Sequence, residues 1–203
     1  MKAQDFRQAL DAQTDEELIG PCLHEEIIPF VFEPKPMSWD TFRDEFVSRL
    51  QVSRSDIRIV GSARFGFSMK PDRNLKSFED KSDIDVVIVN ERMFDQLWHA
   101  LLAAAYPRPP VTNKLGGWLE KRRNEVSTGW ITPPEIRLDP KIYGAKTKAV
   151  LDFNTAWFNT LQIASRHVPR RHENVNGRLY RTWKHAELYH LHSIGALRQT
   201  LTN

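Results

Sequence analysis

The chain has little cysteine and no long apolar segment. Its single cysteine, Cys22, excludes an intrachain disulfide and is typical of a protein in a reducing compartment. We expect Cys22 to be a small buried side chain rather than a nucleophile. No apolar run approaches the roughly 20 residues that cross a bilayer, and the first residues, MKAQDFRQAL, lack the apolar core of a signal peptide. These absences predict a cytoplasmic protein without membrane insertion.

The composition is that of an ordinary globular protein, with 203 residues, 40% of them apolar and 27% charged. This length predicts a single domain. We expect N-terminal helices over 1–52, a core over 53–106, and a mostly helical part with one late strand over 107–203. The net charge of +3 is uneven, because residues 166–203 hold seven Lys or Arg against two acids. Such a segment is either a phosphate-attracting surface or solvated surface charge.

Two β-branched apolar runs, IRIV at 57–60 and IDVVIV at 84–89, predict two buried strands. Because strand side chains alternate, Asp83 and Asp85 share one face, and Ile84 points to the core on the other. Two carboxylates about 7 Å apart along a strand repel each other and attract a cation. Mg²⁺ (or Mn²⁺) is the natural choice, because it binds through one or two carboxylates together with substrate phosphates.

Gly61 and Ser62 follow the first strand directly. Glycine lets the backbone approach a phosphate closely, and Ser62 adds a hydroxyl and an N–H group. The alternative is a plain turn beside two aspartates on an exposed edge strand. An acidic pair inside an apolar strand is costly unless it binds something, which favours the binding site.

This order of an apolar strand, Gly61-Ser62, a spacer and Asp83-Ile84-Asp85 resembles the signature of the DNA polymerase β superfamily of nucleotidyltransferases. The resemblance covers about a sixth of the chain. Its spacer of 20 residues is longer than usual in the superfamily, which suggests an inserted loop near the nucleotide.

The resemblance implies an α/β (α+β) fold, with a small mixed sheet flanked by helices. It also implies that a hydroxyl attacks the α-phosphate of an NTP or dNTP and releases pyrophosphate. Asp83 and Asp85 would hold the metal, and Gly61 and Ser62 would position the phosphates. Arg64 and Lys70 are candidates to neutralise the pyrophosphate, or are solvated.

Active members of the superfamily place a third carboxylate beside the first two. Asp152, in the segment AVLDF at 149–153, has the local pattern of an acid in an apolar strand and is our preferred candidate. Glu187 and Asp139 are the alternatives. Without a third acid, the protein would be slow, would borrow a group from a partner, or would only bind nucleotide.

The pattern GSARFGFS…SDIDVVIV is also similar to minimal nucleotidyltransferases paired with bacterial toxins and to enzymes of anti-phage operons. The segments GRLYRTW at 177–183 and ELYH at 187–190 resemble, more narrowly, the nucleotidyltransferase subunit of the Hailong anti-phage defence system. That resemblance implies template-independent synthesis of a short DNA oligomer, started on a protein tyrosine, that acts on an operon-encoded effector channel. Tyr180 and Tyr189 are the candidate primers, although buried packing is the commoner fate of such tyrosines. The alternatives are a toxin–antitoxin type enzyme that nucleotidylates a protein or tRNA, and a degenerate nucleotide-binding module.

The periodicity of the remaining chain predicts mostly helices. Residues 4–31 look helical, and Thr14 with Glu17 forms a capping box that starts a second helix. Ser38 reads as the N-cap of the next helix. We expect the later elements to be helices at 38–50, 91–106, 115–126, 149–168 and 185–201, and a strand at 175–183.

Overall fold

The structure is a computed structural model that describes residues 2–79, 81–105, 121, 124–133, 147–169 and 174–202. The chain is a mixed α/β protein built around a small four-stranded sheet. The helices of the N-terminal part, with their short 3-10 and π turns, are α1 (Ala3–Ala12), α2 (Asp15–Ile19), η1 (Gly20–His24), η2 (Phe30–Phe32), α3 (Met37–Leu50) and η3 (Arg54–Asp56). The elements that follow are β1 (Ile57–Val60), α4 (Ser62–Phe65), η4 (Pro71–Arg73), β2 (Ile84–Val89), α5 (Glu91–Ala105), β3 (Trp130–Ile131), α8 (Lys148–Ser165), β4 (Val175–Tyr180) and α9 (Trp183–Thr202).

The sheet has the strand order β1-β2-β4-β3. β2 pairs antiparallel with β1 and parallel with β4, and the short β3 closes the other edge by pairing antiparallel with β4. Two register pairs matter most: Asp85 lies opposite Val60 of β1 and opposite Asn176 of β4. The chain therefore places the end of β1, the start of β2 and the start of β4 side by side.

One face of the sheet packs on α3, α5 and α8. Ile84 and Val86 are buried there beside Phe42, Leu97 and Trp157 of those helices, as the strand alternation predicts. Gly177 of β4 faces the same side, because a Cβ at this position would lie 2.8 Å from a ring carbon of Trp157. This face forms the main apolar core.

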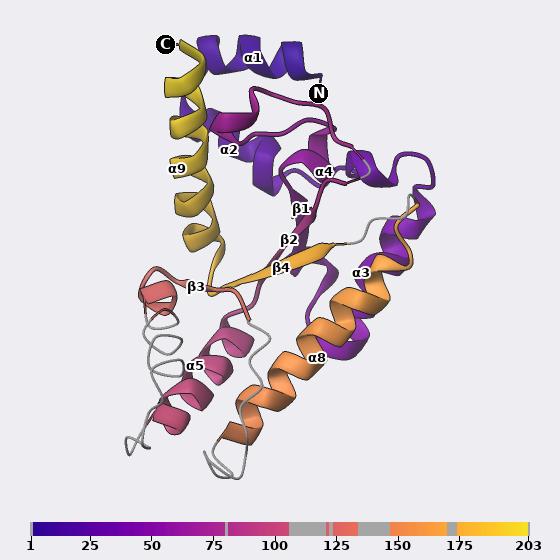
Figure 1. The fold of residues 1–203 in the computed structure, drawn as a ribbon, viewed down its shortest axis with the longest axis vertical. Helices are drawn as coiled ribbons and strands as arrows, with labels where there is room; N and C mark the ends of the chain where they lie inside the picture. Colours follow the sequence, from indigo (N-terminus) through magenta and orange to yellow (C-terminus); the bar gives the residue numbers. More distant parts are fainter. Residues whose placement is uncertain are drawn as a thin grey trace.

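The opposite face packs on α9 and η1. Val87, Val89 and Tyr180 are buried there against Leu23 and Ala186. Figure 1 shows α9 running from the sheet up to α1, with α5 and α8 on the other side of the sheet. A third apolar cluster joins α1, α9 and the segment after α4, and includes Phe6, Phe67 and Ile194. The segment 67–75 is thereby held next to α9.

Most of the expected helices and strands are present, with shifted ends. The Thr14–Glu17 capping box is confirmed, since the Glu17 N–H donates to the Thr14 hydroxyl at 3.2 Å and the Thr14 N–H to the Glu17 carboxylate at 2.8 Å. The helical prediction over 4–31 is confirmed for α1 and α2, whose division falls at Thr14 as expected, but it is wrong beyond η1, where residues 26–29 are not helical. Pro36, not Ser38, is the N-cap of α3, and the Ser38 hydroxyl donates to the Lys35 carbonyl at 2.6 Å.

The late strand is shorter than expected and ends at Tyr180, because α9 already begins at Trp183. The helix expected over 115–126 lies largely outside the described residues. Along the part of the chain that the structure describes, none of the helices is both long enough and apolar enough to span a membrane.

Candidate functional site

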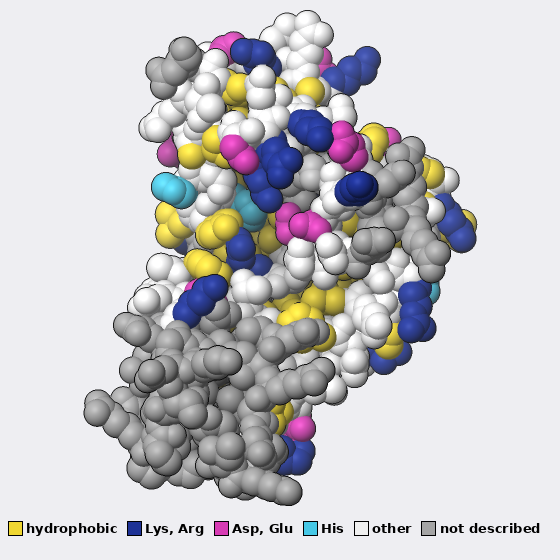
Figure 2. Space-filling view, viewed as in Figure 1, with side chains coloured by type: hydrophobic (Ala, Val, Ile, Leu, Met, Phe, Trp, Pro, Cys, Tyr) yellow, Lys and Arg dark blue, Asp and Glu magenta, His cyan; other side chains and the backbone are white. Residues whose placement is uncertain are grey.

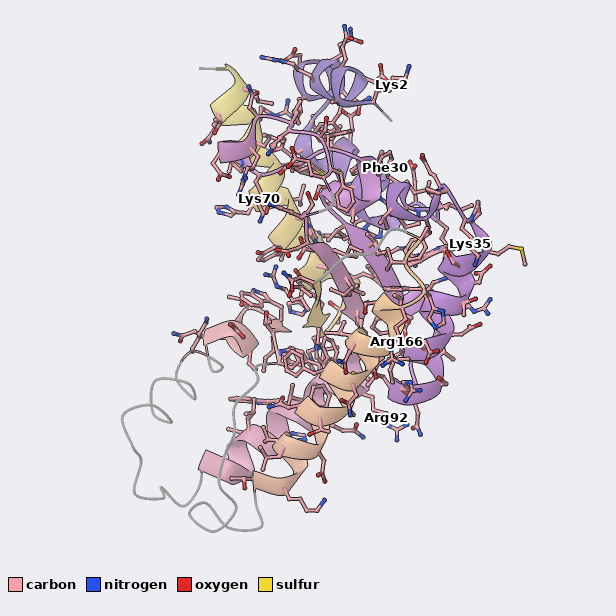
Figure 3. All side chains as sticks on the ribbon, turned by 45° about the vertical axis from the view of Figure 1, so that its right-hand side comes forward. Lys2, Phe30, Lys35, Lys70, Arg92 and Arg166 are labelled. Carbon is pink, nitrogen blue, oxygen red and sulfur yellow. The ribbon has the colours of Figure 1, made fainter. Side chains whose placement is uncertain are left out.

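A cavity of about 670 Å³ lies on the α9 face of the sheet. Its walls come from the ends of β1, β2 and β4, from the segment 68–82, and from the inner side of α9. η4 packs against α9, and Figure 3 shows Lys70, the residue before η4, beside that helix. Figure 2 shows basic, acidic and histidine side chains gathered on this side of the molecule. The cavity therefore combines both signs of charge in one place.

The acidic pair lies at the start of β2 and lines this cavity. Asp83 is exposed and immediately precedes the strand, and Asp85 is half-buried as its second residue. Burial raises the pKa of Asp85, as does the charge of Asp83, and the positive charges of Lys70 and Arg178 lower it. A bound cation would favour the ionised carboxylate in the same way as these basic residues.

Gly61 forms the corner between β1 and α4 and lies directly beside Asp85. Its φ of +64° and ψ of −142° belong to a region that residues with a Cβ rarely adopt. A Cβ at Gly61 would be 4.0 Å from the Asp85 Oδ2 atom. Ser62 follows as the first residue of α4 and also lines the cavity. The structure thus brings together Gly61, Ser62, Asp83 and Asp85 at one cavity.

Of the two basic residues that we expected near the phosphates, only Lys70 is at the cavity. Arg64 is 2% exposed and points the other way, where its Nε donates to the Pro21 carbonyl at 2.9 Å and its Nη2 to the Glu25 carbonyl at 2.7 Å. Burial lowers the pKa of Arg64 to about 10. The expectation for Arg64 is therefore corrected: it fastens η1 and the residue that follows it to α4.

Arg178 is the cavity residue to which the sequence assigned no individual role. It follows Gly177 on β4, so strand alternation turns it to the α9 face, opposite the face that Gly177 shares with Trp157. The same alternation places Arg178 and Tyr180 on one face of the strand. The position of Arg178 opposite Val87 of β2 could not be inferred from the sequence, because this position depends on the pairing of β4 with β2.

Neither Asp152 nor Glu187 lies at the cavity, although Glu79, which pairs with Lys76 at 3.0 Å, lines it. Asp152 lies on α8, is exposed, and forms an ion pair with Lys148 one helical turn earlier. The apolar pattern around Asp152 belongs to a helix, so the strand interpretation is corrected. Glu187 lies on α9 and contacts His24 and Lys184, and Asp139 lies outside the described residues. The position opposite Asp85 on β4 is held by Asn176, an exposed amide that also lines the cavity.

The two candidate tyrosines differ in accessibility. Tyr180 is fully buried, and its hydroxyl accepts a long hydrogen bond of 3.4 Å from Nη1 of Arg178. Burial raises the pKa of Tyr180 above its usual value. Tyr189 is half-buried on α9 and lines the cavity. Cys22 also lines it, is 4% exposed, and has a pKa that burial raises to about 12, so it is an unreactive thiol as expected.

The oxygen ligands at the cavity fit a hard divalent cation such as Mg²⁺. Asp83 and Asp85 offer two carboxylates, and Asn176 offers an amide oxygen from the next strand. Within the described ranges, no group of three or more Asp, Glu, His or Cys side chains gathers into a metal cage. Two carboxylates suffice for Mg²⁺ where phosphate oxygens and water complete the coordination.

Comparison with known proteins identifies no relative. No protein-family model, no curated protein and no solved structure matches the chain. The evidence for a function therefore comes from the cavity and the side chains that line it.

Proposed function

We propose that the chain is a metal-dependent nucleotidyltransferase with the fold of the DNA polymerase β superfamily. It transfers a nucleoside monophosphate from an NTP or dNTP to a hydroxyl group. The observation that carries this proposal is the position of Gly61 and Ser62 beside Asp85 and Asp83 in one cavity. The mixed sheet, with helices on both faces, is compatible with that fold.

The charges of the cavity support phosphate chemistry. Asp83, Asp85, Lys70 and Arg178 all line it, yet among the described residues none of the four forms an ion pair with another. Because these opposite charges are kept apart in one cavity, the cavity suits a ligand that carries both a positive and a negative group. A metal–nucleotide complex is such a ligand, with its cation facing the aspartates and its phosphates facing the basic residues.

Four residues of the cavity have assigned roles in this reaction. The carboxylates of Asp83 and Asp85 would hold the metal ion, which would supply positive charge next to the phosphates. Gly61 keeps the corner free of a side chain, so the triphosphate can approach the backbone. Lys70 offers positive charge to the departing pyrophosphate.

The product is an oligonucleotide made without a template, in a defence against phage that uses a partner effector protein. This finer part of the proposal follows the resemblance of the segments 177–183 and 187–190. Tyr189 supports it as a primer, because its side chain reaches the same cavity as Asp85. Tyr180 is less suited, because its hydroxyl is buried.

Asn176 favours a second candidate function. It occupies the strand position opposite Asp85, where a third acid would lie beside the pair. A neutral amide there cannot act as a general base for the attacking hydroxyl. A protein with this arrangement would bind metal and nucleotide and transfer nucleotides slowly or not at all.

The test is incubation of the purified protein with Mg²⁺ and each labelled NTP and dNTP, followed by a denaturing gel with and without protease. We expect products from the wild type and none from Asp83→Asn/Asp85→Asn. Asp152→Asn is the matched control, because it removes the same kind of charge from an exposed position on α8. This variant should retain full activity. A ladder of labelled products would indicate an oligomer. A change in the mobility of these products after protease treatment would indicate a tyrosine primer. Nucleotide binding without any product would refute the enzymatic proposal for the isolated chain and favour the binding module.

A further inference from the structure

Arg178 is held in a defined orientation at the cavity wall. Its guanidinium carbon lies 4.8 Å from the ring centre of Trp130 and 4.3 Å from that of Tyr189, so aromatic rings of β3 and α9 both hold it. Its Nη1 donates a long hydrogen bond of 3.4 Å to the Tyr180 hydroxyl. Cation–π contacts of this kind orient a guanidinium but do not neutralise it.

The charge of Arg178 has no carboxylate partner in the described part of the chain, which distinguishes it from Arg58, Arg181 and Arg198. Arg58 pairs with Glu26, Arg198 with Asp15, and Arg181 with Glu91 and Asp95. Asp85 is near enough for the charge of Arg178 to lower its pKa, yet the two form no ion pair.

Arg178 is half-buried, so its lack of a charged partner is costly. Its Nε is buried without a hydrogen-bond partner, and an arginine keeps its charge in any protein environment. A buried charge that is not paired destabilises the folded protein. A ligand with negative oxygens in the adjoining cavity would supply the missing partner.

We propose that Arg178 binds a phosphate group of the substrate in this cavity. The planar guanidinium matches two oxygens of a phosphate, and the aromatic rings fix it beforehand, so little entropy is lost on binding. Lys70 lines the same cavity, and its charge likewise lowers the pKa of Asp85. The inference rests on the proposed function in one respect, because the phosphate is taken to belong to a nucleotide or to the strand that accepts it.

Binding without metal tests this role separately from catalysis. Titration calorimetry would measure tripolyphosphate, as the mimic of the triphosphate, and a short oligodeoxynucleotide without a triphosphate, as the mimic of the acceptor strand. We expect Arg178→Met to weaken binding of at least one probe by about ten-fold or more, the effect of losing a charge-assisted hydrogen bond. Loss with tripolyphosphate assigns Arg178 to the incoming nucleotide, and loss with the oligonucleotide alone assigns it to the acceptor.

Arg181→Met is the matched control, because Arg181 follows the same strand but forms ion pairs with Glu91 and Asp95. It should bind both probes within about two-fold of the wild type, since its charge is already neutralised. Asp83→Asn/Asp85→Asn should abolish transfer yet keep metal-free binding, which separates a failure of the proposed reaction from a failure of this inference. Thermal unfolding of each variant checks that it folds. Unchanged binding of both probes by folded Arg178→Met, or no binding by the wild type, would overturn the assignment.

Discussion

The burial of His190 beside Arg178 predicts a loss of stability in mild acid. His190 lies on α9 with its Nε2 buried and without a hydrogen-bond partner, next to the rings of Tyr180 and Tyr189. Burial, and then the positive charge of Arg178, lower the pKa of His190 to about 4 from an ordinary value of 6.5. The unfolded chain therefore binds a proton at a higher pH than the folded chain does.

The direction and size of the stability change follow from this difference between the pKa values of folded and unfolded His190. The stabilising contribution of neutral His190 is fully present above about pH 6.5 and is lost as the pH falls towards 4. A difference of about 2.5 pKa units corresponds to roughly 3 kcal/mol in the free energy of unfolding, of which about 2 kcal/mol is lost by about pH 5. This loss of stability comes from His190 alone, so the measurement must distinguish it from the effect of protonating the carboxylates.

Urea denaturation at a series of pH values makes that separation. The free energy of unfolding is measured for the wild type and for His190→Phe, which keeps an aromatic ring beside the two tyrosines and cannot titrate. We expect the difference between the two proteins to change by about 2 kcal/mol between about pH 7.5 and 5. His99→Gln, on the exposed side of α5, should leave the wild-type dependence unchanged. A constant difference for His190→Phe across this range would refute the buried, neutral state of His190.

Three further substitutions test the cavity and its support. Gly61→Ala should lower the free energy of unfolding by about 1–2 kcal/mol in urea denaturation, because the φ of +64° is strained for alanine. Gly20→Ala is the control and should not destabilise the protein, because Gly20 has a helical φ and open space around it. Arg64→Met should cost about 2–3 kcal/mol, by the same assay, because two backbone carbonyls lose their donors, yet leave the KM for nucleotide within about two-fold; a large rise in KM would restore Arg64 as a phosphate ligand. Arg178→Met should raise the pKa of His190 in an NMR titration, since it removes a neighbouring positive charge, and an unchanged pKa would contradict their placement.

The acidic half of the cavity could be predicted from the sequence because short-range rules govern it. Strand alternation sets the common face of Asp83 and Asp85, and a glycine corner after an apolar strand sets the approach of Gly61. The prediction for β2 needed only its own residues and their neighbours. The capping box at Thr14 was predictable for the same reason, since all its partners lie within four residues.

The basic half could be predicted only for Lys70, because the rest depends on contacts between distant segments. Arg64 and Lys70 are both close to Ser62 in sequence, yet the carbonyls of Pro21 and Glu25 draw Arg64 away from the cavity. Asp152 has apolar neighbours that suit a strand, but its segment packs as a helix. Arg178 reaches the cavity only because β4 pairs with β2, and no local pattern specifies that pairing.

The position of β4 in the sheet has a consequence for how the protein folds. β4 lies between β2 and β3, although residues 90–174 separate it from β2 along the chain. Closing so long a loop costs chain entropy before the parallel pairing can form. We therefore expect the pairing of β2 with β4 to limit the folding rate. Until β4 arrives, β2 presents an unpaired apolar edge that can associate with other chains. Refolding yield should therefore fall as the protein concentration rises, and the same late step that completes the sheet brings Arg178 to the cavity.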